Sequence, residues 1–247
     1  MDTFKQKIKG FFAYVWECVK CSITAGFTYF TASAILYMLA FKEGKALSDQ
    51  IPLCVLVAVC ALAYTGLLAW GYGGSNYEML VSGNMKRISA DQYGNSYKIS
   101  SHSYVKEYRP WKGFVMGAFA CLITVIFVLI FGANQEKITS VFANELKLEG
   151  EKAFAILLLA GMLLAGWAIF PFTCAITAGY TVSYYLALII AVLPIFVFGA
   201  FYIIGAYAKR NKTIRAQEAA DRAAAAAAKP KKINYGGLPG TKPRKRK

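Results

Sequence analysis

Residue types that carry chemistry are few in this sequence, and they do not stand at the spacings that chemistry needs. Cys18 and Cys21 have the C-x-x-C spacing of redox and zinc sites. One such pair supplies two ligands, whereas a protein zinc site normally takes three or four. The only histidine is His102, with no cysteine near it in sequence, and Ser183 has no accompanying base to activate its hydroxyl. We therefore predict no metal, no cofactor and no catalytic residues, and the sequence favours a non-enzymatic protein.

Ionisable side chains are missing from much of the second half of the chain. The 54 residues from Ala153 to Ala206 include no Asp, Glu, Lys, Arg or His. Such a stretch cannot form the surface of a water-soluble fold, and it has room for two membrane crossings of roughly 20 residues each. Ion-coupled transporters and proton pumps usually keep an ionisable group at membrane depth. The sequence therefore predicts an integral membrane protein and argues against those two classes.

Five apolar segments must position whatever the protein binds. Each is about 20 residues long, the length at which a helix crosses the hydrocarbon core of a bilayer. Tyrosine and tryptophan near several segment ends suit the headgroup region. The segments are residues 21–41, 51–72, 113–133, 153–175 and 183–206. The predicted fold is an all-α, polytopic membrane helical bundle with four or five full crossings, and membrane lipids are its first expected partners.

Two regions outside the apolar segments have patterns of their own, one before the first segment and one between the second and the third. Residues 1–20 place bulky apolar side chains at helical spacing with lysines between them. This pattern predicts an amphipathic helix in the membrane interface, or alternatively the first turns of a long first span. Residues 73–112 form a polar, tyrosine-rich loop with a predicted turn at Tyr93-Gly94-Asn95-Ser96. We expect a small helix or hairpin on the membrane there.

Small residues recur four positions apart in two of the segments. The pairs are Gly113-x-x-x-Gly117 and Gly161-x-x-x-Ala165. Such ridges let helix backbones approach closely. We expect them to serve packing within the bundle rather than dimerisation.

A long basic tail, residues 207–247, follows the last apolar segment. It holds 13 Lys and Arg against Glu218 and Asp221, and so supplies most of the net charge of +15. Residues 208–229 are alanine-rich and predicted helical, whereas residues 230–247 combine Gly, Pro and like charges and are predicted disordered. Basic clusters of this kind attract anionic lipid headgroups and also neutralise the phosphates of RNA. The residues expected to bind an anionic partner are Lys209, Arg210, Lys212, Arg215, Lys231, Lys232, Lys242, Arg244, Lys245, Arg246 and Lys247.

The distribution of basic residues conflicts with a simple five-helix topology. Lys and Arg in short loops mark the cytoplasmic side of a membrane protein. Five full crossings would leave 10 basic residues inside and 18 outside, whereas placing both ends inside gives 23 against 5. The charge therefore favours a cytoplasmic tail and an even number of crossings.

One segment that enters the membrane and returns would satisfy this count. Proline and threonine residues lie near the junction of the last two segments, and a broken helix in a membrane is tolerated only where protein or water satisfies its backbone. The candidate pore or substrate lining there consists of Pro171, Thr173, Thr177 and Thr181. The alternative is five ordinary helices, one of which ends at Pro171.

Two functional hypotheses follow. In the first, a non-enzymatic multi-pass membrane protein docks anionic lipid, or nucleic acid such as the RNA of a ribosome, through its tail. In the second, the protein is a small-solute channel or facilitator built around the Pro171–Thr181 break. The sequence leaves open the oligomeric state, the membrane and the solute.

Overall fold

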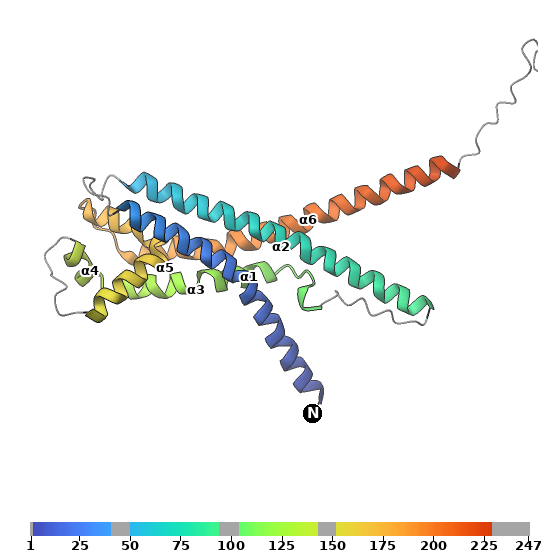
Figure 1. The fold of residues 1–247 in the computed structure, drawn as a ribbon, viewed down its shortest axis with the longest axis horizontal. Coiled ribbons are helices and arrows are strands. Elements are labelled where there is room, and N and C mark those ends of the chain that lie inside the picture. Colours follow the sequence, from blue (N-terminus) through green and yellow to red (C-terminus); the bar gives the residue numbers. More distant parts are fainter. Residues whose placement is uncertain (1, 41–49, 94–103, 143–151, 229–247) are drawn as a thin grey trace, which may run out of the picture. The chain divides into compact units, whose positions relative to one another are not determined.

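The computed structural model describes residues 2–40, 50–93, 104–142 and 152–228, which are helical apart from short connections (Figure 1). The helices are α1 (Asp2–Ala40), α2 (Ile51–Tyr93), α3 (Lys112–Ala133), α4 (Gln135–Phe142), α5 (Lys152–Thr177) and α6 (Ala187–Ala228). Two 3-10 turns, η2 (Tyr104–Lys106) and η3 (Tyr184–Leu186), precede α3 and α6. Within the described residues, five helices are long and apolar enough to cross a membrane. The predictions of an all-α chain and of an integral membrane protein are confirmed at this level.

Residues 1–210 form the bundle, and contacts between distant residues show which elements meet at each of its ends. At one end the Tyr14 ring of α1 lies 4.9 Å from the Trp111 ring just before α3, and Tyr202 of α6 packs on the first turn of α3. We call this the tyrosine end. At the opposite end the Phe131 ring of α3 lies 5.8 Å from the Tyr184 ring just before α6. Helices α1 and α3 therefore run away from the tyrosine end, and α6 returns to it.

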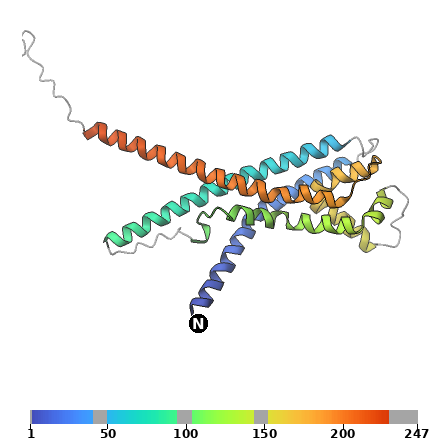
Figure 2. The same ribbon diagram turned by 180° about the vertical axis from the view of Figure 1, so that it is seen from behind.

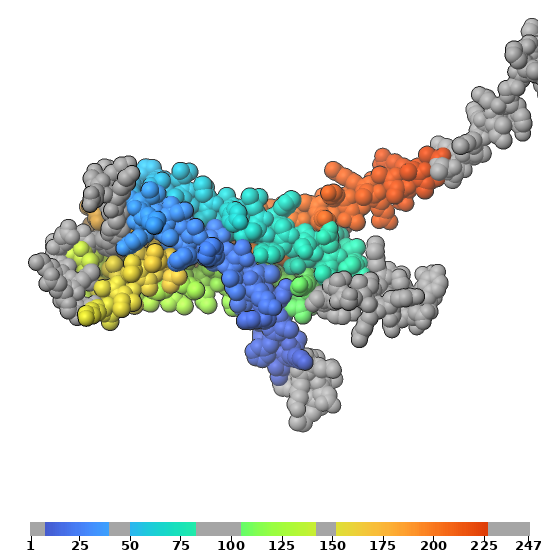
Figure 3. Space-filling view, viewed as in Figure 1, coloured from blue at the N-terminus to red at the C-terminus, as the bar shows by residue number. Residues whose placement is uncertain are grey.

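Helix α2 lies beside α1 and runs in the opposite direction (Figures 1 and 3). The Tyr29 hydroxyl of α1 and the Thr65 hydroxyl of α2 are 2.9 Å apart and share a buried hydrogen bond. Farther along α2, Asn76 reaches Tyr202 at the tyrosine end. Helix α2 therefore also runs toward the tyrosine end.

Glycine lets α3 and α6 pack backbone to backbone, side by side as seen from behind (Figure 2). A Cβ at Gly113 would lie 2.6 Å from the Cβ of Tyr202, and one at Gly117 would lie 2.8 Å from the Cα of Ile195. A Cβ at Gly161 would overlap the Phe131 ring of α3. These approaches are within one chain, so both small-residue pairs contribute to packing inside the bundle.

Helices α2 and α6 approach each other still more closely near the tyrosine end. A Cβ at Gly73 would overlap the carbonyl oxygen of Tyr202, and a Cβ at Gly205 would overlap the carbonyl oxygen of Trp70. The two glycines thus occupy reciprocal positions in one helix crossing. Only glycine has no atom there, so this crossing fixes the spacing of α2 and α6.

Both ends of α5 lie at the end of the bundle opposite the tyrosine end. Near its start, the Phe154 ring lies 4.5 Å from Lys137 Nζ of α4, directly after α3. Near its finish, Cys174 Sγ lies 4.0 Å from Cys54 Sγ in the first turn of α2. Only the middle of α5 reaches deeper, where Trp167 Nε1 donates to Thr124 Oγ1 of α3 over 3.2 Å. Thr124 is nine residues, or about 14 Å of helix, from the end of α3.

Two features of the middle of α5 account for its change of direction. Pro171 lies inside the helix and has no backbone N–H to donate to the preceding turn. One turn earlier, the Trp167 backbone N–H donates to Ser33 Oγ of α1 over 2.9 Å. Helices kink at proline and where a side chain inserts into the hydrogen-bond ladder. The two causes act on successive turns of α5.

Three sequence-based boundaries differ from the structure. No break separates residues 2–20 from the first span, because α1 is one helix, so a separate interfacial helix is not seen. Helix α2 continues into the predicted loop as far as Tyr93. Hydropathy marks where lipid contact ends and not where a helix ends. Residues 94–103 lie outside the described residues. Helix α5 does not end at Pro171 but at Thr177, and the turn follows at Gly179, whose φ of 90° suits glycine.

Candidate functional site

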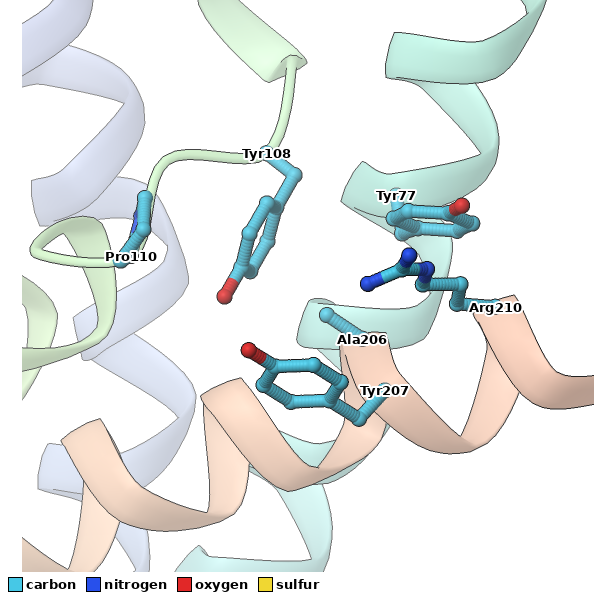
Figure 4. A pocket seen from close by; sticks show the side chains of 6 residues that line it. All are labelled: Tyr77, Tyr108, Pro110, Ala206, Tyr207 and Arg210. Carbon is cyan, nitrogen blue, oxygen red and sulfur yellow. The ribbon is translucent and has the colours of Figure 1, made fainter.

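A small cavity opens at the tyrosine end, between α2, the segment before α3, and α6 (Figure 4). We call it the tyrosine pocket. Its lining residues are Tyr77, Tyr108, Pro110, Ala206, Tyr207 and Arg210. The volume is about 140 Å³, which exceeds the space of several water molecules and is below that of a typical drug-sized site.

Three polar groups point into the pocket, whereas the Tyr77 hydroxyl points away from it (Figure 4). The hydroxyls of Tyr108 and Tyr207 point toward each other across the cavity, and the guanidinium of Arg210 points inward beside the Tyr77 ring (Figure 4). Burial raises the pKa of the Tyr108 phenol, and the neighbouring Tyr207 phenol adds to the effect. Tyr108 therefore stays protonated at neutral pH and can donate a hydrogen bond.

The charge of the pocket comes from Arg210. Its neighbour Lys209 forms an ion pair with Glu78 of α2, so the Glu78 carboxylate is matched by a cation other than Arg210. A guanidinium carries five N–H donors and remains charged at any physiological pH. The pocket thus offers a cation and two phenol donors, the groups that bind an anion.

Asn76 of α2 holds the wall of the pocket in place. Its backbone oxygen accepts from the Tyr108 N–H over 3.0 Å. With the side-chain amide turned to satisfy its neighbours, Nδ2 donates to Lys106 O over 2.9 Å, and Oδ1 accepts from Tyr202 OH at 2.9 Å and Lys112 Nζ at 3.3 Å. One side chain thus connects α2, the segment before α3, α3 and α6.

Lys112 is the fully buried cation of this end. Its Nζ donates to Val105 O over 2.9 Å and lies 5.8 Å from the centre of the Tyr14 ring. The guanidinium of Arg109 lies 5.5 Å from the centre of the same ring. A buried ammonium is costly without such partners, so these contacts tie α1 to the start of α3.

Stacked aromatic rings complete the wall. The Tyr108 ring stacks on the Tyr202 ring with centroids 5.4 Å apart and planes 14° apart. The Tyr77 ring meets Tyr108 edge to face at 6.4 Å. Tyr108 is therefore held on two sides, and its hydroxyl has a fixed direction into the pocket.

The structure places the predicted tail residues in two groups. Lys209 and Arg210 belong to the bundle, the first in the ion pair with Glu78 and the second in the tyrosine pocket. Lys212 and Arg215 lie on the exposed continuation of α6. The remaining predicted residues, Lys231, Lys232, Lys242, Arg244, Lys245, Arg246 and Lys247, lie outside the described residues.

Two of the four predicted pore residues, Thr173 and Thr177, make hydrogen bonds within the chain. Thr173 is fully buried; its hydroxyl accepts from Tyr184 OH over 3.2 Å and donates to Ile169 O over 3.3 Å. The Thr177 hydroxyl donates to backbone oxygens of the preceding turn, at 2.9 and 3.0 Å. Pro171 is half-buried and Thr181 is exposed in the connection to α6. None of these four residues lines the tyrosine pocket.

The sequence predicts Arg210 as one residue of the basic tail and Tyr77 as part of the polar loop, whereas the other aromatic residues lie near segment ends, where interface anchors are expected. Asn76 lies in the predicted loop and is not among the predicted site residues. The missing information is the crossing of α2 and α6, which brings together residues that are about 130 positions apart. The signal within the sequence is the glycine at each side of that crossing.

Comparisons with family models, with curated proteins and with solved structures find no match to this chain.

Proposed function

We propose that the protein is a non-enzymatic, multi-pass membrane protein whose basic C-terminal tail holds an anionic partner at the cytoplasmic surface. The observation that carries this proposal is the continuation of α6. From Asn211 to Ala226 every residue is exposed, and the cations Lys212, Arg215 and Arg222 lie there. Arg222 forms an ion pair with Glu218 over 3.5 Å, and Lys212 and Arg215 lie on the exposed surface, where they can meet an anionic partner.

The arrangement of the bundle supports a cytoplasmic tail. The start of α1, the start of α3 and the last bundle residues of α6 all meet at the tyrosine end, while α5 has both ends at the opposite end. Four crossings, by α1, α2, α3 and α6, with α5 entering and returning, place both termini on one side. That topology gives the count of 23 basic residues against 5, which the positive-inside rule favours.

The composition of the α6 continuation favours a partner in water over the lipid surface. A helix that lies in the membrane interface needs a face of large apolar side chains. Between Asn211 and Ala228 the only large aliphatic residue is Ile214, and most of the others are alanine. We therefore propose RNA, exposed for example on a ribosome, as the partner, bound through its phosphates.

Deleting Pro230–Lys247 tests this function in the full-length protein. The deletion removes seven basic residues. Protein in nanodiscs of neutral lipid is titrated with fluorescent single-stranded RNA, and anisotropy is recorded between about 50 and 200 mM salt. We expect the deletion to weaken binding at least tenfold at low salt and to flatten the salt slope by up to about 5, since each neutralised phosphate adds roughly 0.7.

The matched control keeps the same 18 residues in scrambled order, which preserves the charge and should preserve binding. Unchanged RNA affinity of the deletion at low salt would refute docking through the tail. A further outcome is that the deletion leaves RNA binding unchanged but abolishes binding of the protein to phosphatidylcholine vesicles that contain phosphatidylglycerol. In that case the partner is the anionic membrane surface and the RNA proposal is wrong.

The channel hypothesis gains less support from the geometry. Its threonines donate to backbone oxygens within α5, and Thr173 is closed off from solvent. It predicts that water-soluble thiol reagents modify cysteines introduced at Thr173 or Thr177. Uniform protection of both would exclude a water-filled path there.

A further inference from the structure

The tyrosine pocket lies where the headgroups of a bilayer would be. Trp70 and Tyr72 of α2, Trp111 before α3, and Tyr207 of α6 gather at the same end of the bundle. Such rings prefer the interface between hydrocarbon and water. Whatever enters the pocket therefore meets it at headgroup depth.

An apolar track leads from the pocket along α6 into the membrane. Phe196, Ala200, Ile204 and Tyr207 follow one another at spacings of four, four and three residues, so they share one helix face. Phe196, Ile204 and Tyr207 are 61%, 53% and 55% exposed. An acyl chain lying on this face would end with its headgroup beside Arg210.

We propose that the tyrosine pocket binds the phosphate group of an anionic glycerophospholipid. The Arg210 guanidinium supplies charge and directed N–H donors, the Tyr207 hydroxyl of the same helix supplies a further donor, and the Tyr108 hydroxyl supplies another from the segment before α3 (Figure 4). Guanidinium–phosphate contacts are among the stronger hydrogen bonds in proteins. The cavity of about 140 Å³ admits a phosphate with its first substituent atoms and not a large sugar headgroup.

The same charges disfavour a zwitterionic headgroup. Tyrosine rings alone would suit a quaternary ammonium, but Arg210 would repel it. The site therefore selects for net negative charge. This inference concerns the bundle, and it stands independently of what the tail beyond residue 229 binds.

The test measures thermal stabilisation of full-length protein in a nonionic detergent by short-chain lipid. The probes are dioctanoyl phosphatidylglycerol, dioctanoyl phosphatidylcholine, glycerol phosphate and inorganic phosphate. We expect saturable stabilisation by phosphatidylglycerol and much weaker stabilisation by phosphatidylcholine. Arg210→Gln should raise the apparent Kd for phosphatidylglycerol about tenfold or more, because it removes charge-assisted hydrogen bonds.

Arg215→Gln is the matched control, since it removes the same charge from an exposed position of the same helix outside the pocket. It should change the apparent Kd less than twofold. Tyr207→Phe removes one hydroxyl without changing shape and should weaken binding about threefold or more. This conservative variant keeps the test decisive if Arg210→Gln does not fold.

Several outcomes would overturn the proposal. Equal loss in Arg210→Gln and Arg215→Gln would show diffuse attraction to the basic helix. An equal, Arg210-dependent response to glycerol phosphate or inorganic phosphate would show a site for soluble phosphate rather than lipid. The Pro230–Lys247 deletion must retain phosphatidylglycerol binding; loss of binding in that variant would assign it to the tail. If the tail does not bind RNA, the expected phosphatidylglycerol binding by the pocket is unchanged, so either proposal can be refuted without the other.

Discussion

The closest approach in the bundle, between α2 and α6, gives a sharp test of the architecture. Gly73→Ala places a methyl group on the carbonyl oxygen of Tyr202. Because the obstructing atom belongs to the backbone, no side chain can rotate away and the helices must separate. Overpacking a well-packed site typically costs about 1–3 kcal/mol.

Gly71→Ala in the same helix provides the reference. A Cβ at Gly71 meets nothing within 4 Å, so that variant gains helix propensity, about 0.8–1.0 kcal/mol, without a clash. We expect Gly73→Ala to unfold about 1–3 kcal/mol more easily than Gly71→Ala. The assay is equilibrium unfolding in mixed micelles with increasing dodecyl sulfate, followed by tryptophan fluorescence.

The other glycine of the crossing, Gly205, allows a second test of the same contact. Gly205→Ala places its methyl group on the carbonyl oxygen of Trp70, in the same crossing. Once the helices have separated for one methyl group, the second requires less further movement. The double variant should therefore lose less stability than the sum of the single losses, as expected for residues that share a contact. Equal stability of Gly73→Ala and Gly71→Ala, or additive losses in the double variant, would refute the crossing.

Three further predictions concern α5 and the support of the pocket. Cys54 and Cys174, with Sγ atoms 4.0 Å apart, should form an intramolecular disulfide on oxidation with copper phenanthroline, detected as a linked peptide by mass spectrometry. Ser33→Ala should destabilise the protein by about 1–2 kcal/mol, because the Trp167 N–H loses its acceptor at the kink. Asn76→Leu should cost about 2–3 kcal/mol in the same unfolding assay, because three side-chain hydrogen bonds are lost together.

Each of these three has its own control. Cys60 is exposed and should not be linked to Cys174; a lack of any Cys54–Cys174 product would mean that α5 does not return to the start of α2. Thr31→Ala removes a hydroxyl that donates to Phe27 O on the exposed face of α1 and should shift stability by less than about 0.5 kcal/mol. Asn76→Leu should also weaken phosphatidylglycerol binding, and a stable variant with full binding would disprove its positioning role.

The helical class and the membrane location follow from the sequence because both depend on local properties. The uncharged stretch from Ala153 to Ala206 excludes a water-soluble surface, whatever the tertiary structure. The finer boundaries depend on contacts between distant residues. Helix α2 continues beyond its apolar part, where Gly73 and Asn76 pack on α6, and no local pattern records that packing.

The tyrosine pocket, like the helix boundaries, depends on contacts between distant residues and therefore could not be predicted from local sequence patterns. Each of its aromatic residues is explained locally as an interface anchor, and Arg210 as one basic residue among many in the tail. What distinguishes them is that helix crossings bring them to one cavity. The tail residues beyond the bundle, in contrast, need no tertiary contact to be recognised, because their charge alone suggests an anionic partner.

The path of α5 connects the charge pattern to the packing. Pro171 and the Ser33 hydroxyl weaken successive turns of this helix, and beyond these turns Thr173 and Cys174 contact residues at the end from which α5 started. In the proposed topology, α5 adds a fifth apolar helix without a fifth crossing. That topology would place the start of α1 and the bundle part of α6 on the same side of the membrane, as the count of basic residues favours. Replacing Pro171 by Ala restores one backbone donor but leaves the Ser33 bond, so the kink requires both residues to be changed before α5 can straighten.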